Sequence, residues 1–243
     1  MPDIDLTAIA ATLGGSRPLH GYLVSPPGNG PWPGVVMVHE AFGLDEVMRR
    51  QAERLAGAGF LTLAVDLYSE GGARKCLVAT IRSMMKGEGR AFADIEAARR
   101  WLLESPLCTG KIGSIGFCLG GGFVLLTVGT GFDVASANYG QLPKDLETVL
   151  INACPVVASY GARDRTLKNA AAKLERALSQ AGVVHDVKEY PNAGHAFLND
   201  APTGPRPLRP LLRITGMKPE PESASDAWRR IDAFFHNYLD GDT

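Results

Sequence analysis

Cys118 lies between two glycines in the segment Gly116-Phe117-Cys118-Leu119-Gly120, after a β-branched run and before an apolar stretch. This G-x-C-x-G pattern is the cysteine counterpart of the nucleophile elbow, a sharp turn that joins the end of a strand to the start of a helix. Such a turn raises its middle residue above the sheet, near the positive end of the helix. That position favours the thiolate, the form of cysteine that attacks carbonyl carbon. The alternative is a glycine-rich turn that happens to contain a buried cysteine.

An acid and a histidine follow Cys118 at the ends of two later apolar runs. Asp164 comes just after Val156 to Tyr160, and His195 lies in a glycine-containing loop after Val183 to Tyr190. The order nucleophile, acid, histidine is that of the α/β-hydrolases. In such an arrangement His195 takes the proton of the thiol or of water, and Asp164 fixes its tautomer. Considered alone, each has a simpler explanation: Asp164 as a helix cap or turn residue, and His195 as a loop histidine bonded to backbone.

The composition excludes several classes of protein. The chain has 243 residues, of which 45% are hydrophobic and 21% charged, as in an ordinary globular protein of one large domain. A formal net charge of -1 provides no basic field for a nucleic acid. The first residues, Met1 to Asp5, lack the basic and apolar regions of a signal peptide, and no stretch reaches the roughly 18 apolar residues of a spanning helix. We expect a single domain over residues 1–243, a cytoplasmic location and no nucleic-acid or membrane partner.

The four cysteines, Cys76, Cys108, Cys118 and Cys154, form no C-x-x-C pair. Their spacing indicates neither a zinc site nor a disulfide framework. We therefore expect four free thiols, no metal and no cofactor.

Apolar runs typical of strands alternate with segments of helical periodicity along the chain. The predicted strands are Leu19–Ser25, Gly34–Val38, Phe60–Val65, Ile112–Phe117, Val134–Tyr139, Val156–Tyr160 and Val183–Tyr190. The predicted helices lie at 44–55, at 92–102, directly after Cys118, at 167–181 and at 228–239. This alternation predicts an α/β fold, with a mostly parallel sheet between two layers of helices. Ligands of such sheets bind beyond the carboxyl ends of the strands, and Cys118 stands at one such end.

Two stretches show little periodicity. The pattern is weak between Ser69 and Gly89. From Asn199 to Ser223 the chain is rich in proline, which predicts a long loop before the C-terminal helix. Loops of such length tend to be functional or mobile, and whether this one acts as a lid stays open. Ser223 and Ser225 are candidate caps at the start of the helix.

The chain resembles the dienelactone hydrolase family, a cysteine branch of the α/β-hydrolases, from about Leu19 onward. The matching segments are Val38-His39-Glu40-Ala41-Phe42-Gly43-Leu44, Asp66-Leu67-Tyr68, Gly113 to Gly121, Tyr139-Gly140, Gly161 to Asp164 and Gly194-His195-Ala196-Phe197. A cysteine elbow combined with a glutamate at the end of an early strand is unusual among hydrolases. The resemblance implies an α/β-hydrolase fold and hydrolysis of ester or lactone bonds without a metal or organic cofactor.

The resemblance also implies roles for residues that the bare sequence leaves open. In the resembling enzymes, the glutamate equivalent to Glu40 contacts the resting thiol and accepts its proton when substrate arrives. From its residue type alone, Glu40 is a solvated carboxylate or a partner of an arginine such as Arg49. The backbone N–H groups of Leu119 and Ala41 are expected to form the oxyanion hole.

One departure from the family concerns substrate. Asn199 stands where the namesake enzymes have an arginine that binds the substrate carboxylate. The second arginine of that site falls in the weakly patterned stretch, where Arg74 and Arg82 are both available. Tyr139 is a further candidate for substrate contact. Three arginines of the long loop form either another anion site or solvated charges: Arg206, Arg209 and Arg213. Uncharged esters and lactones therefore stay open as substrates.

Three functions remain to be distinguished. The first is a hydrolase of ester or lactone bonds, monomeric or a small homo-oligomer, with a Cys-His-Asp triad and an acyl-enzyme on Cys118. The second is a non-catalytic or redox-sensing thiol protein on the same fold, which peroxide sensitivity of Cys118 without an ester burst would favour. The third is a binding module that exposes its terminal helix. It is weaker, because Trp228, Phe234 and Phe235 are better explained as core.

Overall fold

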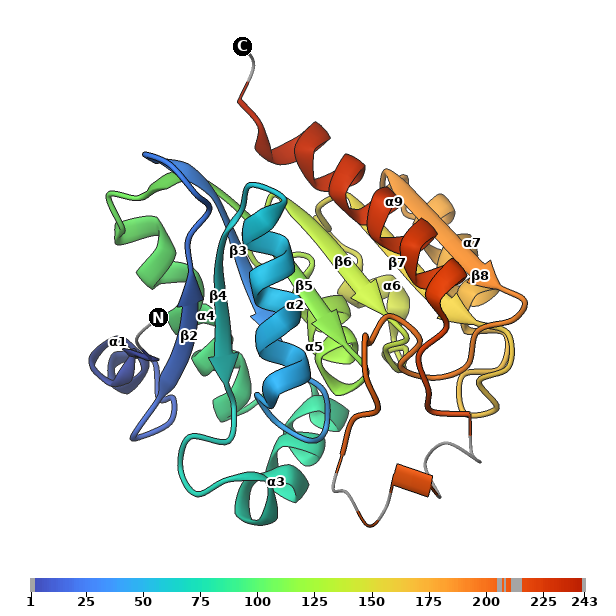
Figure 1. Cartoon of the computed structure of the whole chain (residues 1–243), viewed down its shortest axis with the longest axis horizontal. Coiled ribbons are helices and arrows are strands. Elements are labelled where there is room, and N and C mark those ends of the chain that lie inside the picture. Colours follow the sequence, from blue (N-terminus) through green and yellow to red (C-terminus); the bar gives the residue numbers. More distant parts are fainter. Residues whose placement is uncertain (1–2, 205–206, 208, 211–215, 242–243) are drawn as a thin grey trace.

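The computed structural model describes residues 3–204, 207, 209–210 and 216–241. Within these residues eight strands form one sheet in the order β1-β2-β4-β3-β5-β6-β7-β8 (Figure 1). Their bounds are β1 (Asp3–Asp5), β2 (His20–Val24), β3 (Trp32–Val38), β4 (Leu61–Asp66), β5 (Cys108–Phe117), β6 (Val134–Asn138), β7 (Val156–Gly161) and β8 (His185–Tyr190). β2 pairs antiparallel with β1 and β4, and the other neighbouring strands are parallel. The mostly parallel sheet of the predicted α/β fold is confirmed.

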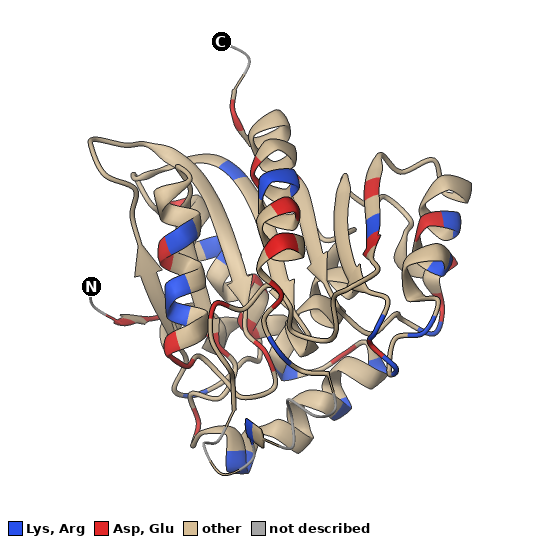
Figure 2. Cartoon of the chain, turned by 45° about the vertical axis from the view of Figure 1, so that its right-hand side comes forward, with Lys and Arg blue, Asp and Glu red and all other residues tan. Residues whose placement is uncertain are grey.

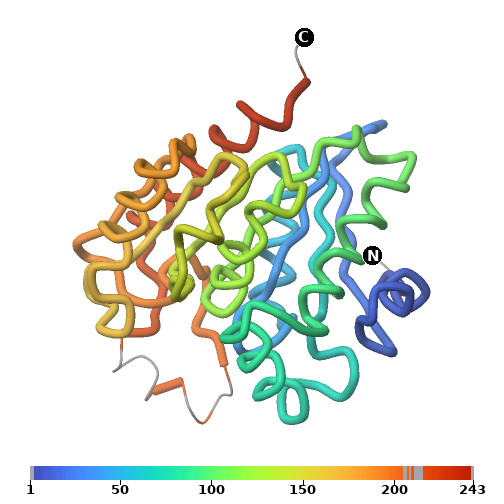
Figure 3. Tube along the Cα trace, turned by 180° about the vertical axis from the view of Figure 1, so that it is seen from behind, coloured from blue at the N-terminus to red at the C-terminus, as the bar shows by residue number. Residues whose placement is uncertain are grey.

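Helices cover both faces of this sheet. Their bounds are α1 (Thr7–Thr12), α2 (Glu46–Gly57), α3 (Ala73–Lys86), α4 (Arg90–Glu104), α5 (Leu119–Thr127), α6 (Leu146–Val149), α7 (Ala170–Gln180) and α9 (Pro221–Leu239). α2 and α9 lie on the face that Figure 1 shows in front, and α4, α5 and α7 lie on the face that Figure 3 shows in front. The sheet is therefore the middle of three layers.

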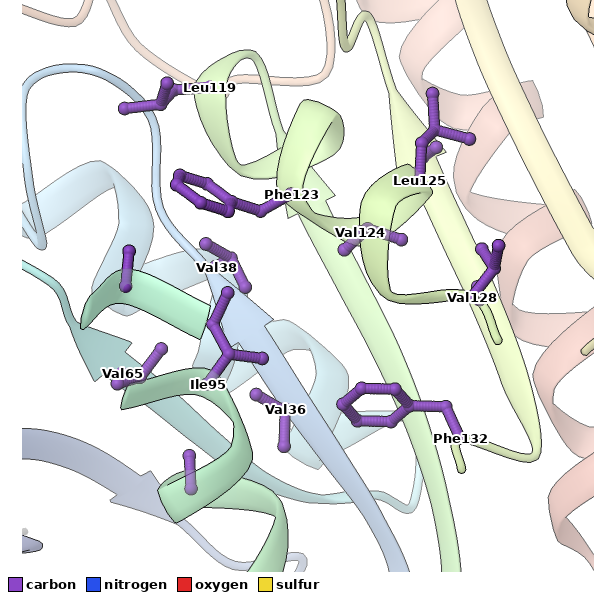
Figure 4. Close-up of a cluster of buried hydrophobic side chains, with 14 of the residues drawn as sticks. Val36, Val38, Val65, Ile95, Leu119, Phe123, Val124, Leu125, Val128 and Phe132 are labelled. Carbon is purple, nitrogen blue, oxygen red and sulfur yellow. The ribbon is translucent and has the colours of Figure 1, made fainter. Parts of the chain in front are cut away.

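The two faces of the sheet bury separate apolar clusters. On the face of α4 and α5, Val36 and Val38 of β3 pack with Ile95 and Phe123 (Figure 4). On the face of α2 and α9, Met37 belongs to the second cluster. Because β3 supplies alternate residues to both clusters, its sequence is a continuous apolar run rather than an alternation of apolar and polar residues.

α3 is the longest element that the sequence pattern does not predict. It begins after Gly72 without a side-chain cap, in the stretch of weak periodicity. Its inward residues, such as Leu77 and Ile81, are only partly buried. The apolar side chains of Val78 and Met85 are 65% and 61% exposed. These outward apolar residues blur the helical stripe on which the prediction depends. β1, α1 and α6 escape prediction because each is short.

The C-terminal helix has a different start from the predicted one. α9 begins at Pro221, and the carboxylate of Glu220 accepts a hydrogen bond of 2.8 Å from the N–H of Ser223. The prediction that Ser223 or Ser225 caps this helix is wrong, because both lie inside it. A longer acidic side chain one residue before the proline does the capping instead.

Residues of both charge signs are interspersed along α2 and α9 (Figure 2). Arg54 of α2 pairs with Asp232 of α9 at 3.1 Å. Beneath them Trp228 and Phe235 are 5% and 0% exposed, and Phe234 is partly buried against the same cluster. These aromatic residues of α9 therefore belong to the core, as expected.

Of the expected loop at 199–223 only part belongs to the described residues, and Arg206 and Arg213 lie outside them. In the described part of the chain, no helix has the length and apolar character needed to cross a membrane.

Candidate active site

The predicted functional residues follow the carboxyl ends of parallel strands. Cys118 follows β5, and Glu40 follows the neighbouring strand β3. Asp164 and His195 follow β7 and β8, which are also neighbours. Parallel strands end at one edge of a sheet, so residues far apart in the sequence lie at that edge together.

The turn at Cys118 is sharp, and its geometry requires the flanking glycines. Cys118 has φ 52° and ψ -111°, an unusual conformation for a residue with a side chain. A Cβ atom added to Gly116 would lie 2.2 Å from the carbonyl oxygen of Gly120, and one added to Gly120 would lie 2.1 Å from the carbonyl oxygen of Val38. No side chain fits at either position. Cys118 itself stays partly exposed at the start of α5.

Asp164 and His195 are in direct contact. Nδ1 of His195 lies 2.5 Å from Oδ2 of Asp164. The other carboxylate oxygen, Oδ1, accepts hydrogen bonds from the N–H and hydroxyl of Thr166 at 2.9 and 2.7 Å. The N–H of Arg163 donates to the carbonyl of Ala193 at 2.9 Å, which joins the two loops. Asp164 therefore accepts hydrogen bonds within its own turn, as the simpler explanation expects, and also pairs with His195.

The groups around His195 favour its protonated form. Burial opposes a charged ring, but hydrogen bonds to Asp164 and Cys118 and the charges of both outweigh it and raise the pKa of His195 to about 10. Burial would likewise raise the pKa of Asp164, yet the hydrogen bonds from His195 and Thr166 lower it below its usual value. The side chain of His195 is 15% exposed, so it remains accessible to water.

Glu40 is a buried carboxyl group held by neutral donors. It is 2% exposed, and it accepts hydrogen bonds of 3.2 Å from the hydroxyl of Tyr139 and the amide of Asn199. Burial raises the pKa of Glu40, and the charge of His195 and the two hydrogen bonds offset only part of that effect. Arg49, the alternative partner, instead pairs with the first residue of β1 at 3.2 Å.

Two backbone N–H groups lie in segments that adjoin Cys118. Leu119 is the first residue of α5, and Ala41 follows Glu40 in the loop after β3. α5 begins directly against the end of β3, as the close approach at Gly120 shows. Among the described residues, none accepts a hydrogen bond from either N–H group. Free N–H groups at a helix N-terminus attract negative charge.

Comparison with known proteins identifies the family. Residues 19–239 match the model of the dienelactone hydrolase family. The chain belongs to the dienelactone hydrolase family. It is 30% identical over 195 residues to the carboxymethylenebutenolidase of Pseudomonas putida, a match that covers 76% of this chain and 83% of that enzyme. This member is therefore a hydrolase of the carboxylic ester and lactone class.

Solved structures share the α/β-hydrolase fold of this chain. A dienelactone hydrolase-like promiscuous phosphotriesterase from metagenomic libraries superposes with a TM-score of 0.82 at 24% identity, covering 98% of both chains. The dienelactone hydrolase of Anabaena variabilis superposes with a TM-score of 0.68 at 20% identity, covering 98% of this chain and 97% of that one.

Two residues expected to contact substrate lie against Glu40 instead. Tyr139 is 0% exposed, and its ring centroid is 5.2 Å from that of His195. Asn199 is 3% exposed, and its Nδ2 donates to both carboxylate oxygens of Glu40. Neither side chain is open to a substrate, and both orient Glu40.

The candidate arginines have separate environments. Arg82 lines a cavity of about 380 Å³ whose lining does not include Cys118. Arg74 is exposed in the first turn of α3. Arg209 lines a different cavity, of about 500 Å³, together with Phe42 of the loop after β3.

Two residues near the site are not singled out by the sequence. His39 is 0% exposed and bonds to the backbone of the loop after β3, and the hydroxyl of Tyr68 donates to the carbonyl of Ala41 at 3.0 Å. Both lie in segments that match the family, but only the fold shows what they contact. Within the part of the chain that is described, no three His, Cys, Asp or Glu side chains are grouped to hold a metal ion, and the four cysteines are free.

Proposed function

We propose that this member of the dienelactone hydrolase family cleaves ester or lactone bonds through an acyl-enzyme on Cys118, with His195 as the proton carrier and Asp164 as its orienting partner. The observation that carries the proposal is the 2.5 Å contact between His195 and Asp164, with Cys118 close enough to His195 to raise the pKa of the ring. Side chains that follow three strand ends meet there. A structural ion pair alone would not need a strained, partly exposed thiol beside it.

Acylation begins when the thiolate of Cys118 attacks the carbonyl carbon and the electron pair of the C=O bond moves to oxygen. The N–H groups of Leu119 and Ala41 stabilise the resulting oxyanion. In other hydrolases the loss of one such donor lowers kcat roughly 10²- to 10³-fold. The intermediate then becomes a thioester as the C–O bond to the alcohol breaks and His195 gives its proton to the leaving oxygen.

In deacylation His195 accepts a proton, whereas in acylation it donates one. Once the sulfur is bonded to the acyl carbon, its charge no longer supports the imidazolium, and the pKa of His195 falls. His195 then takes a proton from water while the water oxygen attacks the thioester carbon. The C–S bond breaks, the acid leaves, and the thiolate and imidazolium are restored.

Glu40 is assigned a supporting role in this cycle. The family resemblance gives it the thiol proton, but its oxygens accept from Tyr139 and Asn199. Cys118 instead acts on His195, whose pKa it raises, so these contacts favour His195 as the first acceptor of the proton. We assign to Glu40 the electrostatic support of the imidazolium, with direct acceptance of the thiol proton as the second candidate role.

The proposed substrates are uncharged esters and lactones. Binding of a carboxylate by two parallel hydrogen bonds requires an arginine beside the reacting carbonyl. The amide of Asn199 is used by Glu40, and Arg82 lines a cavity apart from Cys118. Two expected carboxylate-binding positions are therefore not available to substrate.

Stopped-flow hydrolysis of p-nitrophenyl acetate tests the mechanism. We expect a burst of p-nitrophenol and then slower turnover, and the variant Cys118→Ala loses both by at least about 10³-fold. Cys108→Ala is the matched control, since Cys108 is a partly exposed cysteine at the other end of β5. Equal turnover by Cys118→Ala and the wild type would refute the mechanism. Oxidation of Cys118 by peroxide without any ester turnover would support the redox-sensing alternative.

A further inference from the structure

Both ring nitrogens of His39 are bonded to the backbone. His39 follows β3 and is 0% exposed. Its Nδ1 lies 2.7 Å from the carbonyl oxygen of Glu40, and its Nε2 lies 3.1 Å from the backbone nitrogen of Leu67, just after β4. Asp66 is farther away, with Oδ1 at 3.7 Å from Nε2, beyond an ordinary hydrogen bond.

These partners determine the tautomer of the ring. A carbonyl oxygen only accepts, so Nδ1 of His39 must carry the hydrogen. The N–H of Leu67 only donates, so Nε2 must be unprotonated. The ring is therefore neutral, and burial, which lowers the pKa of His39, agrees with this. With both nitrogens occupied, His39 is not available as a base.

The hydrogen bond from His39 acts on the peptide unit that carries an oxyanion donor. The carbonyl of Glu40 and the N–H of Ala41 belong to one planar trans peptide and point in opposite directions. The N–H of Gly43 donates to the same carbonyl at 3.1 Å. Fixing that oxygen fixes the direction of the N–H group, and bonds to the oxygen also polarise the N–H as a donor.

Tyr68 holds the next carbonyl of the loop. Its hydroxyl donates to the carbonyl of Ala41 at 3.0 Å, and its ring packs edge-on against His39 with centroids 4.7 Å apart. The peptide units on both sides of Ala41 are thus attached to side chains that themselves contact each other.

We propose that His39 and Tyr68 form a clamp that orients the N–H of Ala41 toward the oxyanion of the reaction. Both are positioning residues, and neither touches the substrate. The inference rests on the proposed function, because it assigns Ala41 to the oxyanion hole. It adds the residues that hold this donor in place and connects the hole to the end of β4.

Two variants test the clamp. His39→Leu removes both ring bonds, and Tyr68→Phe removes only the hydroxyl. We expect kcat for p-nitrophenyl acetate to fall roughly 10- to 100-fold in each, with KM changed less than about threefold. Thr62→Val is the control, since it removes a buried hydroxyl at the far end of β4 that bonds to Phe60. It should keep the wild-type kcat.

Alkylation separates positioning from general damage to the site. Iodoacetamide reacts with the Cys118 thiolate without forming an oxyanion, so its rate at the Cys118 peptide should stay within about twofold in both variants. His39→Asn places an amide N–H near the position of Nδ1 and should keep kcat within about fivefold of wild type. If His39→Leu does not fold, kcat and the alkylation rate of Tyr68→Phe and His39→Asn provide the test.

Several outcomes would overturn the clamp. They are an unchanged kcat in both His39→Leu and Tyr68→Phe, a loss of alkylation parallel to the loss of kcat, or an equal loss in His39→Asn and His39→Leu. If the burst depends on Cys118 but is unchanged in the His39 and Tyr68 variants, only the clamp is refuted. Turnover that persists in Cys118→Ala refutes the proposed function, whatever the variants at His39 show.

Discussion

The contact between Asp164 and His195 holds the pKa of the imidazole ring above its ordinary value. Hydrogen bonds and charge hold the pKa of His195 near 10, against an ordinary value of 6.5. In the proposed mechanism the imidazolium of His195 therefore persists through neutral pH and is lost only as the pH rises toward 10. A change at Asp164 should move that limit in a definite direction.

Asp164→Asn is predicted to shift the alkaline limb of kcat/KM to lower pH. The substitution removes the charge and the acceptor that raise the pKa of His195, so the ring loses its proton nearer to 6.5. The pH profile of p-nitrophenyl acetate hydrolysis measures the limb. Glu175→Gln, which removes the same charge from the exposed side of α7, should leave it in place. An unmoved limb in Asp164→Asn would show that Asp164 does not set the state of His195.

Glu40→Gln is predicted to stabilise the fold at pH 8. A raised carboxyl pKa means that folding favours the protonated form, so the stability it contributes at low pH is lost as the pH rises through the folded pKa. A neutral amide avoids that loss, and Asn199, whose Oδ1 has no described partner, can turn to accept from it. We expect Tm to rise by about 2–4 °C at pH 8, by calorimetry, and the gain to vanish at pH 4. Equal gains at both pH values would contradict the linkage.

The same variant separates the two roles of Glu40. If Glu40 only supports the imidazolium, Glu40→Gln should lower kcat/KM about tenfold and keep the burst. Complete loss of the burst would show that Glu40 itself accepts the thiol proton. Asp45→Asn, a change at another carboxylate of the same loop, is the control and should retain the burst.

Residue types predict only part of this site. Cys118, Asp164 and His195 are found from their order and from the strand ends they follow, because the α/β sheet requires those ends to meet. The contacts of Glu40 with Tyr139 and Asn199 join residues far apart in the chain, and only the packed fold brings them together. For the same reason Asn199 was expected at the substrate and lies at Glu40.

The elbow at the start of α5 depends on backbone contact. The carbonyl group of Val38 touches Gly120 so closely that a methyl group there must displace β3 or α5. The glycine pattern predicts this turn because it reflects a local steric requirement. α3 and the true cap of α9 are not predicted, because partial burial and a capping glutamate leave weaker signals.

Gly120→Ala is predicted to destabilise the protein by about 3 kcal/mol, or roughly 6–12 °C in Tm, and to abolish the burst. The added Cβ would lie 2.1 Å from the carbonyl oxygen of Val38, so the nucleophile moves with the helix. Gly57→Ala, at the end of α2 with nothing within 4 Å of the added Cβ, is the matched control and should be neutral or slightly stabilising. Thermal unfolding of both variants measures the difference, and equal Tm values would contradict the steric argument.

At the scale of the whole molecule, charge is balanced, and eight arginines of the described residues form ion pairs with acidic side chains. The net charge is -1. Arg50 and Arg54 of α2 pair with Asp200 and Asp232 at 2.5 and 3.1 Å. The alternation of strands and helices predicts the three layers correctly, because each layer needs its own apolar face. The sequence does not show which arginines are engaged, since those pairs form between distant segments.

This balance predicts a preference for uncharged substrates. We expect kcat/KM for phenyl acetate to exceed that for phenyl hydrogen succinate at least about tenfold, because Asn199 stands at the expected arginine position and its amide is used by Glu40. Added salt should change the ratio little, since no strong field steers either ester. A higher kcat/KM for the anionic ester, falling steeply with salt, would reveal an anion site beside Cys118.

The most direct test of the central claim is an acid quench within the burst, followed by peptide mass spectrometry. The account predicts an acetyl group on the peptide that contains Cys118, which hydroxylamine removes as it removes other thioesters. The acetyl group should disappear as the burst gives way to free enzyme. Product that accumulates with no acyl group on Cys118, or with the acyl group on another residue, would contradict the account.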